Sequence, residues 1–599
     1  MNVGHRQGLN NKGRSPDWPF LFKLFQVIDP NADNKIVASG AEFLVNELAR
    51  GGVRFAFTVP GESFLGVLDA LRDRTDIRTI ATRHEGAAGF MAEATGKLSG
   101  RPGLCMATRM VGAANMAIGL HTAMQDSSPL IAILGQVPTD KRGREAFQEA
   151  DLVSIFSPMV KWAVEPARPE LLAEIANKAV RVATQGRPGP VVVSLPEDIL
   201  SMECTVTNSL KQSMPQPVEA PAGVVRQILE RLRLAKNPII IVGAGVLASG
   251  ATDAVVEFAD REKIGVLAGW RRPDAFPNDH GCYLGHTGLR ASSTVRKSLT
   301  EADTVLVVGH RLDENTALGY SFPGSEAELI IVDTAVESMM VPSGVDLMAV
   351  ADALSFFNAL NRAADASKLD DDTVAGRQQL LKTRHDEWVE ETTPVHGSAS
   401  ESYADLTSIT RHIHKLAPES TIYTSDAGTF SGWLDRYVRF NRPGTFLGPI
   451  SGAMGYAVPA AIAAKLHKPD QPVVSFSGDG GFLMTGAEIE TAVREQTPLV
   501  ALVFDNQKYA TIEVHQERHY PGRPIATGLG PVDFAEFASS LGGRGYTIRH
   551  ESEFPDAFAD ALKSDEPCVL DIKTDPEQIS VNDDVIPRPS GIIEPAGPV

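Results

Sequence analysis

Two apolar, β-rich runs near the carboxyl end of the chain each stop at short, oxygen-bearing side chains. Residues 473–477 lead into Gly478-Asp479-Gly480, and residues 499–504 lead into Asp505 and Asn506. The helical stretch between them, residues 485–495, makes a strand–helix–strand unit with two parallel neighbouring strands. The Asp479 carboxylate and the Asn506 amide oxygen are then expected at the carboxyl edge of a sheet, where open α/β sheets bind ligands.

The residue types at this edge suit a metal ion and a diphosphate. Mg²⁺ prefers hard oxygen ligands, takes few of them from protein, and fills its other positions with water and phosphate oxygens. The glycines let main-chain N–H groups approach a diphosphate at the start of a helix. Gly-Asp-Gly is also a common turn sequence, so an ordinary strand–turn–helix gives the same pattern. The motif alone leaves both interpretations open.

Length, charge and cysteine content restrict the class of protein. A chain of 599 residues is long enough for three or four domains. Its net charge of −19 argues against nucleic acid or an anionic membrane surface as a partner. Four scattered cysteines without metal-ligand or redox spacing predict a reduced, cytoplasmic protein. No apolar run reaches transmembrane length.

Strand-like and helix-like segments alternate along most of the chain. Such alternation predicts parallel sheets covered by helices, and therefore an α/β protein with three Rossmann-like, doubly wound domains. Residues 214–221 are rich in proline and polar residues and are expected to form a linker. The predicted division is an N-terminal extension 1–35, domains 36–205, 222–385 and 403–575, and a tail 576–599.

The second domain carries part of a dinucleotide fingerprint. Gly243-Ala244-Gly245 follows the apolar run 239–242, and Ala248 stands where a third glycine is usual. This signal is weak. A bound nucleotide and a purely structural turn both remain open.

The first domain contains Glu85 at the point where a strand ends and a helix of small residues begins. An isolated glutamate there is explained by the helix dipole. The segment 83–92, however, resembles the R-H-E-x-x-A-x-x-M-A segment of thiamine diphosphate (ThDP) enzymes of the acetolactate synthase and pyruvate oxidase group. The segment 478–506 likewise resembles their G-D-G…N-N motif, with Asp505 in place of the first asparagine. Similarity to the acetolactate synthase-like family extends, with motifs in the same order, from residue 36 to about residue 574.

The resemblance implies a domain arrangement and an assembly. The three domains would be pyrimidine-binding (36–205), central (222–385) and diphosphate-binding (403–575). In the family the active site forms between the first domain of one subunit and the third domain of another. A homodimer or homotetramer acting on a small 2-oxo acid is therefore expected.

The same resemblance assigns roles to individual residues. Glu85 would be catalytic, because its carboxyl group bonds the pyrimidine N1′ and assists proton transfer there. Asp479, Asn506 and the main-chain oxygen of Lys508 would bind Mg²⁺, and Met454 would impose the bent shape of the cofactor. The full set of expected cofactor contacts is Pro60, Gly61, Glu85, Asn115, Gly428, Thr429, Phe430, Gly452, Met454, Gly478, Asp479, Gly480, Gly481 and Asn506. Asn115 is equally explained as a helix cap or polar core residue.

Other segments bear on the substrate. Residues 143–149 resemble a family segment ending in A-F-Q-E, which places Phe147 and Gln148 near the reacting carbon. Thr511 and His515 stand where acetolactate synthases have Met and Trp, so the choice of acceptor is open. Glu197 replaces a family lysine, and 285–288 departs from a central-domain motif, so FAD is left open as well.

Two classes of function follow. The first is a ThDP- and Mg²⁺-dependent enzyme that decarboxylates a pyruvate-like 2-oxo acid and passes the acyl carbanion to a carbonyl acceptor. Simple decarboxylation and FAD-linked oxidation are alternatives within this class. The second is a non-catalytic paralogue that keeps the fold as a structural or regulatory subunit.

Overall fold

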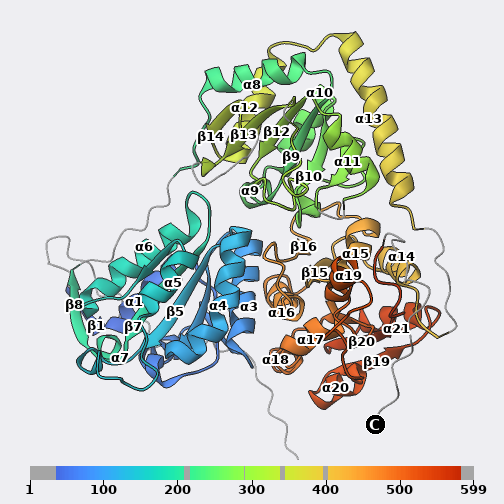
Figure 1. Ribbon diagram of the computed structural model, residues 1–599. Helices are drawn as coiled ribbons and strands as arrows, with labels where there is room; N and C mark the ends of the chain where they lie inside the picture. Colours follow the sequence, from blue (N-terminus) through green and yellow to red (C-terminus); the bar gives the residue numbers. More distant parts are fainter. Residues whose placement is uncertain are drawn as a thin grey trace, which may run out of the picture.

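The computed structural model describes residues 35–207, 216–288, 291–324, 326–336, 344–394 and 402–581. These residues form three six-stranded parallel sheets flanked by helices (Figure 1). The predicted α/β class with three doubly wound parallel-sheet domains is confirmed. The expected N-terminal extension lies outside the described residues except for Lys35, and the expected tail is described only as far as residue 581.

The first sheet has the strand order β3-β2-β4-β5-β7-β6. Its strands are β2 (Phe55–Thr58), β3 (Arg78–Ala81), β4 (Gly103–Thr108), β5 (Leu130–Gln136), β6 (Trp162–Val164) and β7 (Pro190–Pro196). Helices α1 (Gly40–Arg50), α2 (Leu65–Arg72) and α6 (Leu172–Thr184) cover one face, and α3 (Glu85–Ser99), α4 (Arg109–Asp126) and α5 (Leu152–Phe156) cover the other. Strand β1 (Lys35–Ser39) pairs antiparallel with β8 (Glu203–Thr207), which follows α7 (Glu197–Ser201).

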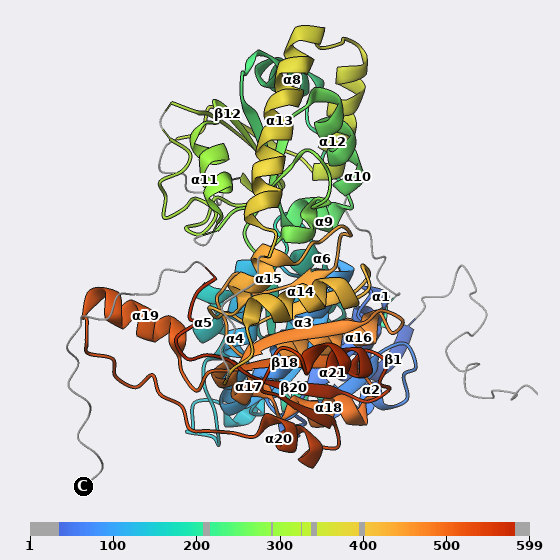
Figure 2. The same ribbon diagram turned by 90° about the vertical axis from the view of Figure 1, so that its right-hand side faces the viewer.

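The central sheet has the order β11-β10-β9-β12-β13-β14. Its strands are β9 (Pro238–Val242), β10 (Gly265–Ala268), β11 (Tyr283–His286), β12 (Thr304–Val308), β13 (Glu328–Asp333) and β14 (Leu347–Val350). The helices are α8 (Ala222–Leu234), α9 (Ala244–Ser249), α10 (Thr252–Glu262), α11 (Ser293–Thr300), α12 (Ala353–Asp365) and α13 (Asp371–Glu391). In both ribbon views this domain stands over the other two (Figures 1 and 2).

The third sheet has the order β16-β15-β17-β18-β20-β19. Its strands are β15 (Ile422–Ser425), β16 (Phe446–Leu447), β17 (Val473–Gly478), β18 (Val500–Asp505), β19 (Arg544–Ile548) and β20 (Cys568–Lys573). Helices α14 (Leu406–Leu416), α15 (Ser431–Tyr437) and α21 (Phe554–Ala561) pack on one face, and α16 (Ala457–His467), α18 (Glu488–Arg494) and α20 (Phe534–Ser540) on the other. Helices α17 (Asp479–Thr485) and α19 (Ala510–His519) begin beyond the carboxyl ends of β17 and β18.

The predicted strand–helix–strand unit differs from the structure in one respect. Strands β17 and β18 are parallel neighbours, with Gly478 opposite Phe504. The single helix expected over 485–495 is instead two short helices, α17 and α18, and α17 starts at Asp479 itself. Gly486 packs tightly on Phe482, since a Cβ at Gly486 would lie 2.8 Å from both the ring and the carbonyl oxygen of Phe482. The chain turns there before α18.

A buried polar network joins the three domains. Helix α3 packs against α16, where the rings of Phe90 and Tyr456 meet edge to face. The Tyr456 hydroxyl donates to Glu93 over 2.6 Å, and Lys97 lies 3.0 Å from Glu93. Lys97 also pairs with Asp126, which accepts a further bond from Arg272 of the central domain. Paired charges at this depth depend on one another, because removing one partner leaves the other unpaired.

None of the helices in the described part of the chain combines the length and apolarity that crossing a bilayer requires.

Candidate active site

A cavity of about 220 Å³ lies at the carboxyl edge of the third sheet. Strands β15, β17 and β18 end beside it, so residues far apart in sequence converge there, as this edge of a parallel sheet allows. The predicted site residues among its walls are Gly428, Thr429, Phe430, Gly452, Met454, Gly478, Asp479, Gly480, Gly481, Asn506, Lys508 and Thr511.

Asp479 is buried in this cavity with an incomplete set of hydrogen bonds. Its Oδ1 accepts the Gly480 N–H over 2.7 Å. Its Oδ2 is buried and has no hydrogen-bond partner among the described residues. Burial, together with the neighbouring carboxylate of Asp505, raises the pKa of Asp479 to about 7. A buried carboxylate oxygen without a donor is the environment in which a bound cation is favourable.

Two further oxygens lie on the turn that follows β18. The Asn506 Oδ1 accepts the Lys508 N–H over 3.1 Å, and Gln507 between them has a positive φ of 57°. The Lys508 ammonium pairs with Glu513 at 3.0 Å, so that side chain is engaged elsewhere. No group of three or more His, Cys, Asp or Glu side chains suited to a metal occurs in the described ranges. The candidate metal ligands are therefore one carboxylate, one amide oxygen and one main-chain oxygen, a set that suits Mg²⁺.

Glycines keep the floor of the cavity free of side chains. A Cβ on Gly480 would lie 2.4 Å from the Tyr509 ring, and one on Gly428 would lie 2.2 Å from the Phe430 ring. Gly452 has a φ of +72°, a conformation that other residues rarely adopt. The main chain is thus exposed to a ligand, and the residues present fit a diphosphate with its cation.

Glu85 lies at a second edge, the carboxyl edge of the first sheet. It is the first residue of α3 and is half-buried. The Asn115 amide donates to its Oε2 over 2.9 Å, and a Cβ on Gly112 would lie 3.1 Å from its Oε1. The loop before it is held by Glu488 of α18, whose Oε1 accepts the N–H groups of residues 83 and 84 over 2.9 and 3.1 Å.

The remaining predicted residues of the first domain share this edge. Pro60 and Gly61 follow β2, and a Cβ on Gly61 would lie 2.4 Å from the Thr108 side chain. Phe147 and Gln148 lie in the loop after β5. Phe147 is 70% exposed, and its main-chain carbonyl accepts a hydrogen bond from Arg109 over 3.1 Å. Gln148 has a positive φ of 63°.

The two edges do not come together within one chain. Among the described residues, those lining the 220 Å³ cavity all belong to the third domain, so Glu85, Asn115, Phe147 and Gln148 lie apart from it. His515 is also absent from its walls. It lines a neighbouring cavity of about 250 Å³ between the central and third domains, which shares Ala427, Gly428 and Thr511 with the first cavity.

Comparison with known proteins identifies the family. Three family models match in order: the thiamine pyrophosphate enzyme N-terminal TPP binding domain over residues 38–155, the central domain over 225–360, and the C-terminal TPP binding domain over 426–572. A probable acetolactate synthase large subunit of Methanocaldococcus jannaschii is 32% identical, covering 90% of this chain and 92% of its own length. This chain belongs to the thiamine diphosphate enzymes.

Other relatives place the chain in the acetolactate synthase-like group of this family. Acetolactate synthase of Bacillus subtilis is 29% identical over 92% of this chain and 96% of its own length. The acetolactate synthase isozyme 3 large subunit of Escherichia coli is 29% identical over 88% and 92%. The chain is thus a ThDP-dependent enzyme of the transferase and lyase class, similar to these synthases.

Sequence reasoning missed several residues of this ThDP enzyme's site. Glu488 fixes the Glu85 loop, Tyr509 packs on Gly480, and Arg271 lines the interdomain cavity. Tyr509 stands three residues beyond Asn506, so proximity along the chain was an available signal. Glu488 and Arg271 contact segments about 405 and about 155 residues away, and nothing local in the sequence marks them.

Proposed function

We propose that this enzyme binds ThDP with Mg²⁺, decarboxylates a 2-oxo acid of the pyruvate type and transfers the acyl group to a carbonyl acceptor. The observation that carries the proposal is the buried Asp479 carboxylate in a cavity lined by several glycines. Its Oδ2 accepts no hydrogen bond from the described residues. The names of the relatives support pyruvate as donor and acetolactate as product.

Residues of the third domain would hold the cofactor. Asp479, Asn506 and the main-chain oxygen of Lys508 would bind Mg²⁺. The main chain around Gly478 and Gly480 would bind the diphosphate, and Met454 would support the bent cofactor. When bound, the cofactor supplies a carbon nucleophile and stabilises negative charge at the acyl carbon.

Glu85 would hold a proton at the pyrimidine N1′. The bond that Asn115 donates to Oε2 fixes the carboxyl group, and the other oxygen, Oε1, lies over Gly112. Because Gly112 has no side chain, the Oε1 of Glu85 remains accessible to a ring nitrogen. Phe147, Gln148, Thr511 and His515 would contact the substrates.

The separation of the two edges supports an assembly. We infer that the first-domain edge of one subunit faces the third-domain cavity of another, in a homodimer or homotetramer. Each cofactor would then be held by two chains. The enzyme is also proposed to be cytoplasmic, since its four cysteines are buried and free, and to act without nucleic acid or membrane.

The central domain bears on the flavin alternative. A Cβ on Gly243 would lie 2.2 Å from the His310 ring, and one on Gly269 would lie 2.3 Å from the same ring. The imidazole thus packs directly on the turn after β9, where a dinucleotide pyrophosphate binds in Rossmann-like domains. A cavity of about 80 Å³ lined by Ala244, Gly245 and His310 lies beside the same turn, so FAD, and with it the flavin-linked oxidase, stays open.

Two measurements test the proposal. Calorimetric titration should show that ThDP binds in the presence of Mg²⁺, and an absence of binding would leave the non-catalytic paralogue as the better account. CO₂ release from pyruvate is then measured with and without a second carbonyl compound. If no acceptor changes the rate or the product, carboligation is wrong and simple decarboxylation remains.

A further inference from the structure

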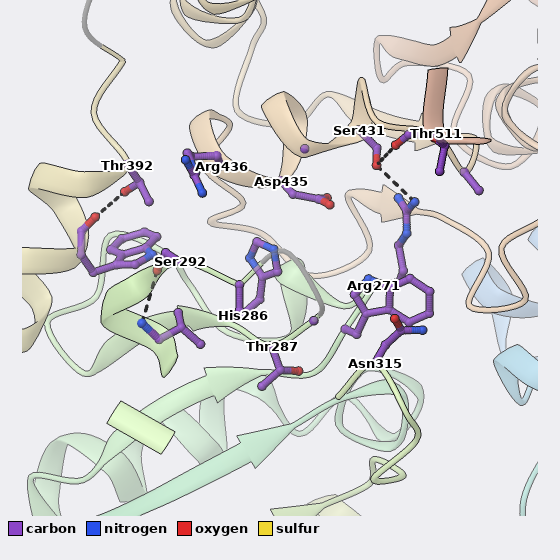
Figure 3. A pocket seen from close by; sticks show the side chains of 18 of the residues that line it. Arg271, His286, Thr287, Ser292, Asn315, Thr392, Ser431, Asp435, Arg436 and Thr511 are labelled. Carbon is purple, nitrogen blue, oxygen red and sulfur yellow. Dashed lines mark hydrogen bonds between the residues drawn. The ribbon is translucent and has the colours of Figure 1, made fainter. Parts of the chain in front are cut away.

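The cavity between the central and third domains is lined by both apolar and charged side chains, and Figure 3 shows Arg271, Asp435 and Arg436 among them. Trp270, Trp388 and Val295 contribute apolar surface. Arg271 extends from the central domain toward Ser431 of α15. At about 250 Å³ the cavity is close to the lower end of small-molecule sites, which suits a small organic ligand rather than a macromolecule.

Arg271 is a buried cation with hydrogen-bonding capacity to spare. Its side chain is among the buried ones, at 5% exposure. Its Nη2 makes two long bonds, 3.3 Å to the Asp426 carbonyl and 3.4 Å to the Ser431 hydroxyl. Its Nε and Nη1 have no hydrogen-bond partner in the part of the chain that the structure describes. Nη2 shares one edge of the guanidinium with Nε and the other with Nη1, so either edge can donate two hydrogen bonds to the oxygens of a carboxylate.

The main chain holds Arg271 in this position at a conformational cost. Its φ is +59°, in the left-handed region that non-glycine residues seldom adopt. The next residue, Arg272, is buried and donates from Nη1 to the Arg271 carbonyl over 2.7 Å. Its Nη2 bonds Asp126 over 3.0 Å, which ties the loop to the interdomain network. Strain that is maintained by such surroundings is typical of functional positions.

Charges around the cavity favour an anion. Arg271 and Arg436 line the cavity together with the carboxylate of Asp435. Burial lowers the pKa of His286, which also lines the cavity; Asp435 acts in the opposite direction, and the guanidinium groups of Arg271 and Arg436 lower that pKa further. Two positive groups thus face one negative group.

We propose that this cavity binds the carboxylate of an organic acid substrate with an apolar body larger than that of pyruvate, and that Arg271 is the specificity-determining contact. The proposal deepens the proposed function and rests on it, because the cavity shares Ala427, Gly428 and Thr511 with the diphosphate cavity. The acid's carboxylate and the 2-oxo carbon bonded to it lie at the Arg271 end of the cavity, which is also the end of Thr511 and the cofactor site, and its apolar body lies against Trp270 and Trp388.

Binding is measured on the full-length protein without ThDP, by the change in tryptophan fluorescence. The probes are phenylacetate, its neutral analogue phenylacetamide, acetate, and inorganic phosphate. Wild type should bind phenylacetate at least about tenfold more tightly than any of the other three, because only phenylacetate has both the carboxylate and the apolar body. Arg271→Met should weaken phenylacetate at least about tenfold, and Arg271→Lys should fall between. Arg442→Met is the matched control, since Arg442 is an exposed arginine of the third domain paired with Glu419, and it should bind like wild type.

Equal affinity of wild type and Arg271→Met, or of the acid and the amide, would overturn the proposal. Phosphate binding as tightly as phenylacetate would overturn the carboxylate assignment. If Arg271→Met fails to fold, as judged by thermal unfolding, two measurements still test the proposal. They are the phenylacetate affinity of Arg271→Lys and the comparison of phenylacetate with phenylacetamide on wild type. ThDP with Mg²⁺ is then titrated into the same samples. If the cofactor binds and phenylacetate does not, this inference is refuted and the proposed function is intact. If phenylacetate binds and the cofactor does not, the proposed function is refuted.

Discussion

At the scale of single residues, the buried carboxylate of Asp479 lowers the stability of the metal-free protein, and the proposed Mg²⁺ would offset that cost. Burial and Asp505 raise its pKa to about 7, and Asp505 is itself paired with Lys573 at 2.5 Å. Because the folded-state pKa lies above the ordinary value near 3.8, folding favours the protonated form. The resulting penalty grows as pH rises from about 4 to about 7 and is constant above that. A cation beside Oδ2 would remove it.

Replacing Asp479 with Asn should therefore separate stability from binding. At pH 8 the metal-free Asp479→Asn protein should unfold a few degrees above wild type, and this advantage should shrink toward pH 5, where the wild-type carboxyl is protonated. At the same time its affinity for ThDP with Mg²⁺ should fall at least about tenfold. Thermal scans across pH and calorimetry measure the two effects.

Asp73→Asn serves as the control, because the Asp73 side chain is 89% exposed and should show neither effect. Undiminished ThDP affinity in Asp479→Asn would remove this residue from the metal site.

Glu85→Gln tests the role of the first-domain carboxyl group. The amide keeps the shape and can still bond Asn115, so ThDP affinity should stay within about threefold of wild type. Hydrogen–deuterium exchange at the cofactor C2, followed by NMR, should slow at least about a hundredfold, since general acid–base assistance contributes that much or more. An exchange rate equal to that of wild type would mean that Glu85 has another role.

The sequence identifies site residues well where they stand next to a strand end. Asp479 and Asn506 follow β17 and β18 directly, so their convergence could be predicted from the chain. His515 could not be placed in the same way. Thr511 and His515 lie one helical turn apart on α19, yet Thr511 lines both cavities and His515 lines the interdomain cavity. Arg271 was missed because its partners Asp426 and Ser431 lie about 155 and 160 residues away.

At the scale of elements, the crossing of α3 and α4 positions Glu85. The helices meet at Gly89 and Gly119, where a Cβ on Gly119 would lie 2.6 Å from the Gly89 Cα. Both helices contribute main-chain atoms to this contact, so no flexible side chain could move aside to make room for an added Cβ. Close packing of this kind tolerates no added methyl group without a shift of the helices.

Gly119→Ala should therefore destabilise the protein by about 1–3 kcal/mol, lowering the unfolding temperature and weakening the Glu85–Asn115 arrangement. Gly223→Ala is the matched control, because Gly223 lies in helix α8 with nothing within 4 Å of an added Cβ. That variant should be neutral or slightly stabilised, as alanine is the better helix former. Thermal unfolding of both variants checks the contrast, and a stable Gly119→Ala protein would mean that the helices can separate freely.

In the central domain the apolar run 239–242 forms β9, whereas β10, β11 and β14 have four residues each and carry too little pattern to be recognised. The break between α17 and α18 was missed for a related reason. It depends on how Gly486 packs against Phe482, which a helical periodicity does not reveal.

At the scale of the whole molecule, polar contacts join the three domains. Glu488 of α18 holds the Glu85 loop, and Arg272 and Lys97 meet at Asp126 between the domains. In this arrangement Glu85 is not among the residues that line the Asp479 cavity of the same chain. The number of domains could be predicted from the chain length and from the alternation of strand-like and helix-like segments. That the two edges belong to one site shared by two subunits was expected only from the family resemblance, because no local pattern indicates it.

Subunit complementation tests the shared site most directly. Glu85→Gln and Asp479→Asn are mixed in equal amounts under conditions that exchange subunits, and C2 hydrogen–deuterium exchange is measured. If each site joins Glu85 of one subunit to Asp479 of another, half of the random dimers are mixed and one of their two sites is intact, so about a quarter of the wild-type rate should return. If the mixture exchanges no faster than the average of the two variants alone, the site lies within one chain and the account is contradicted.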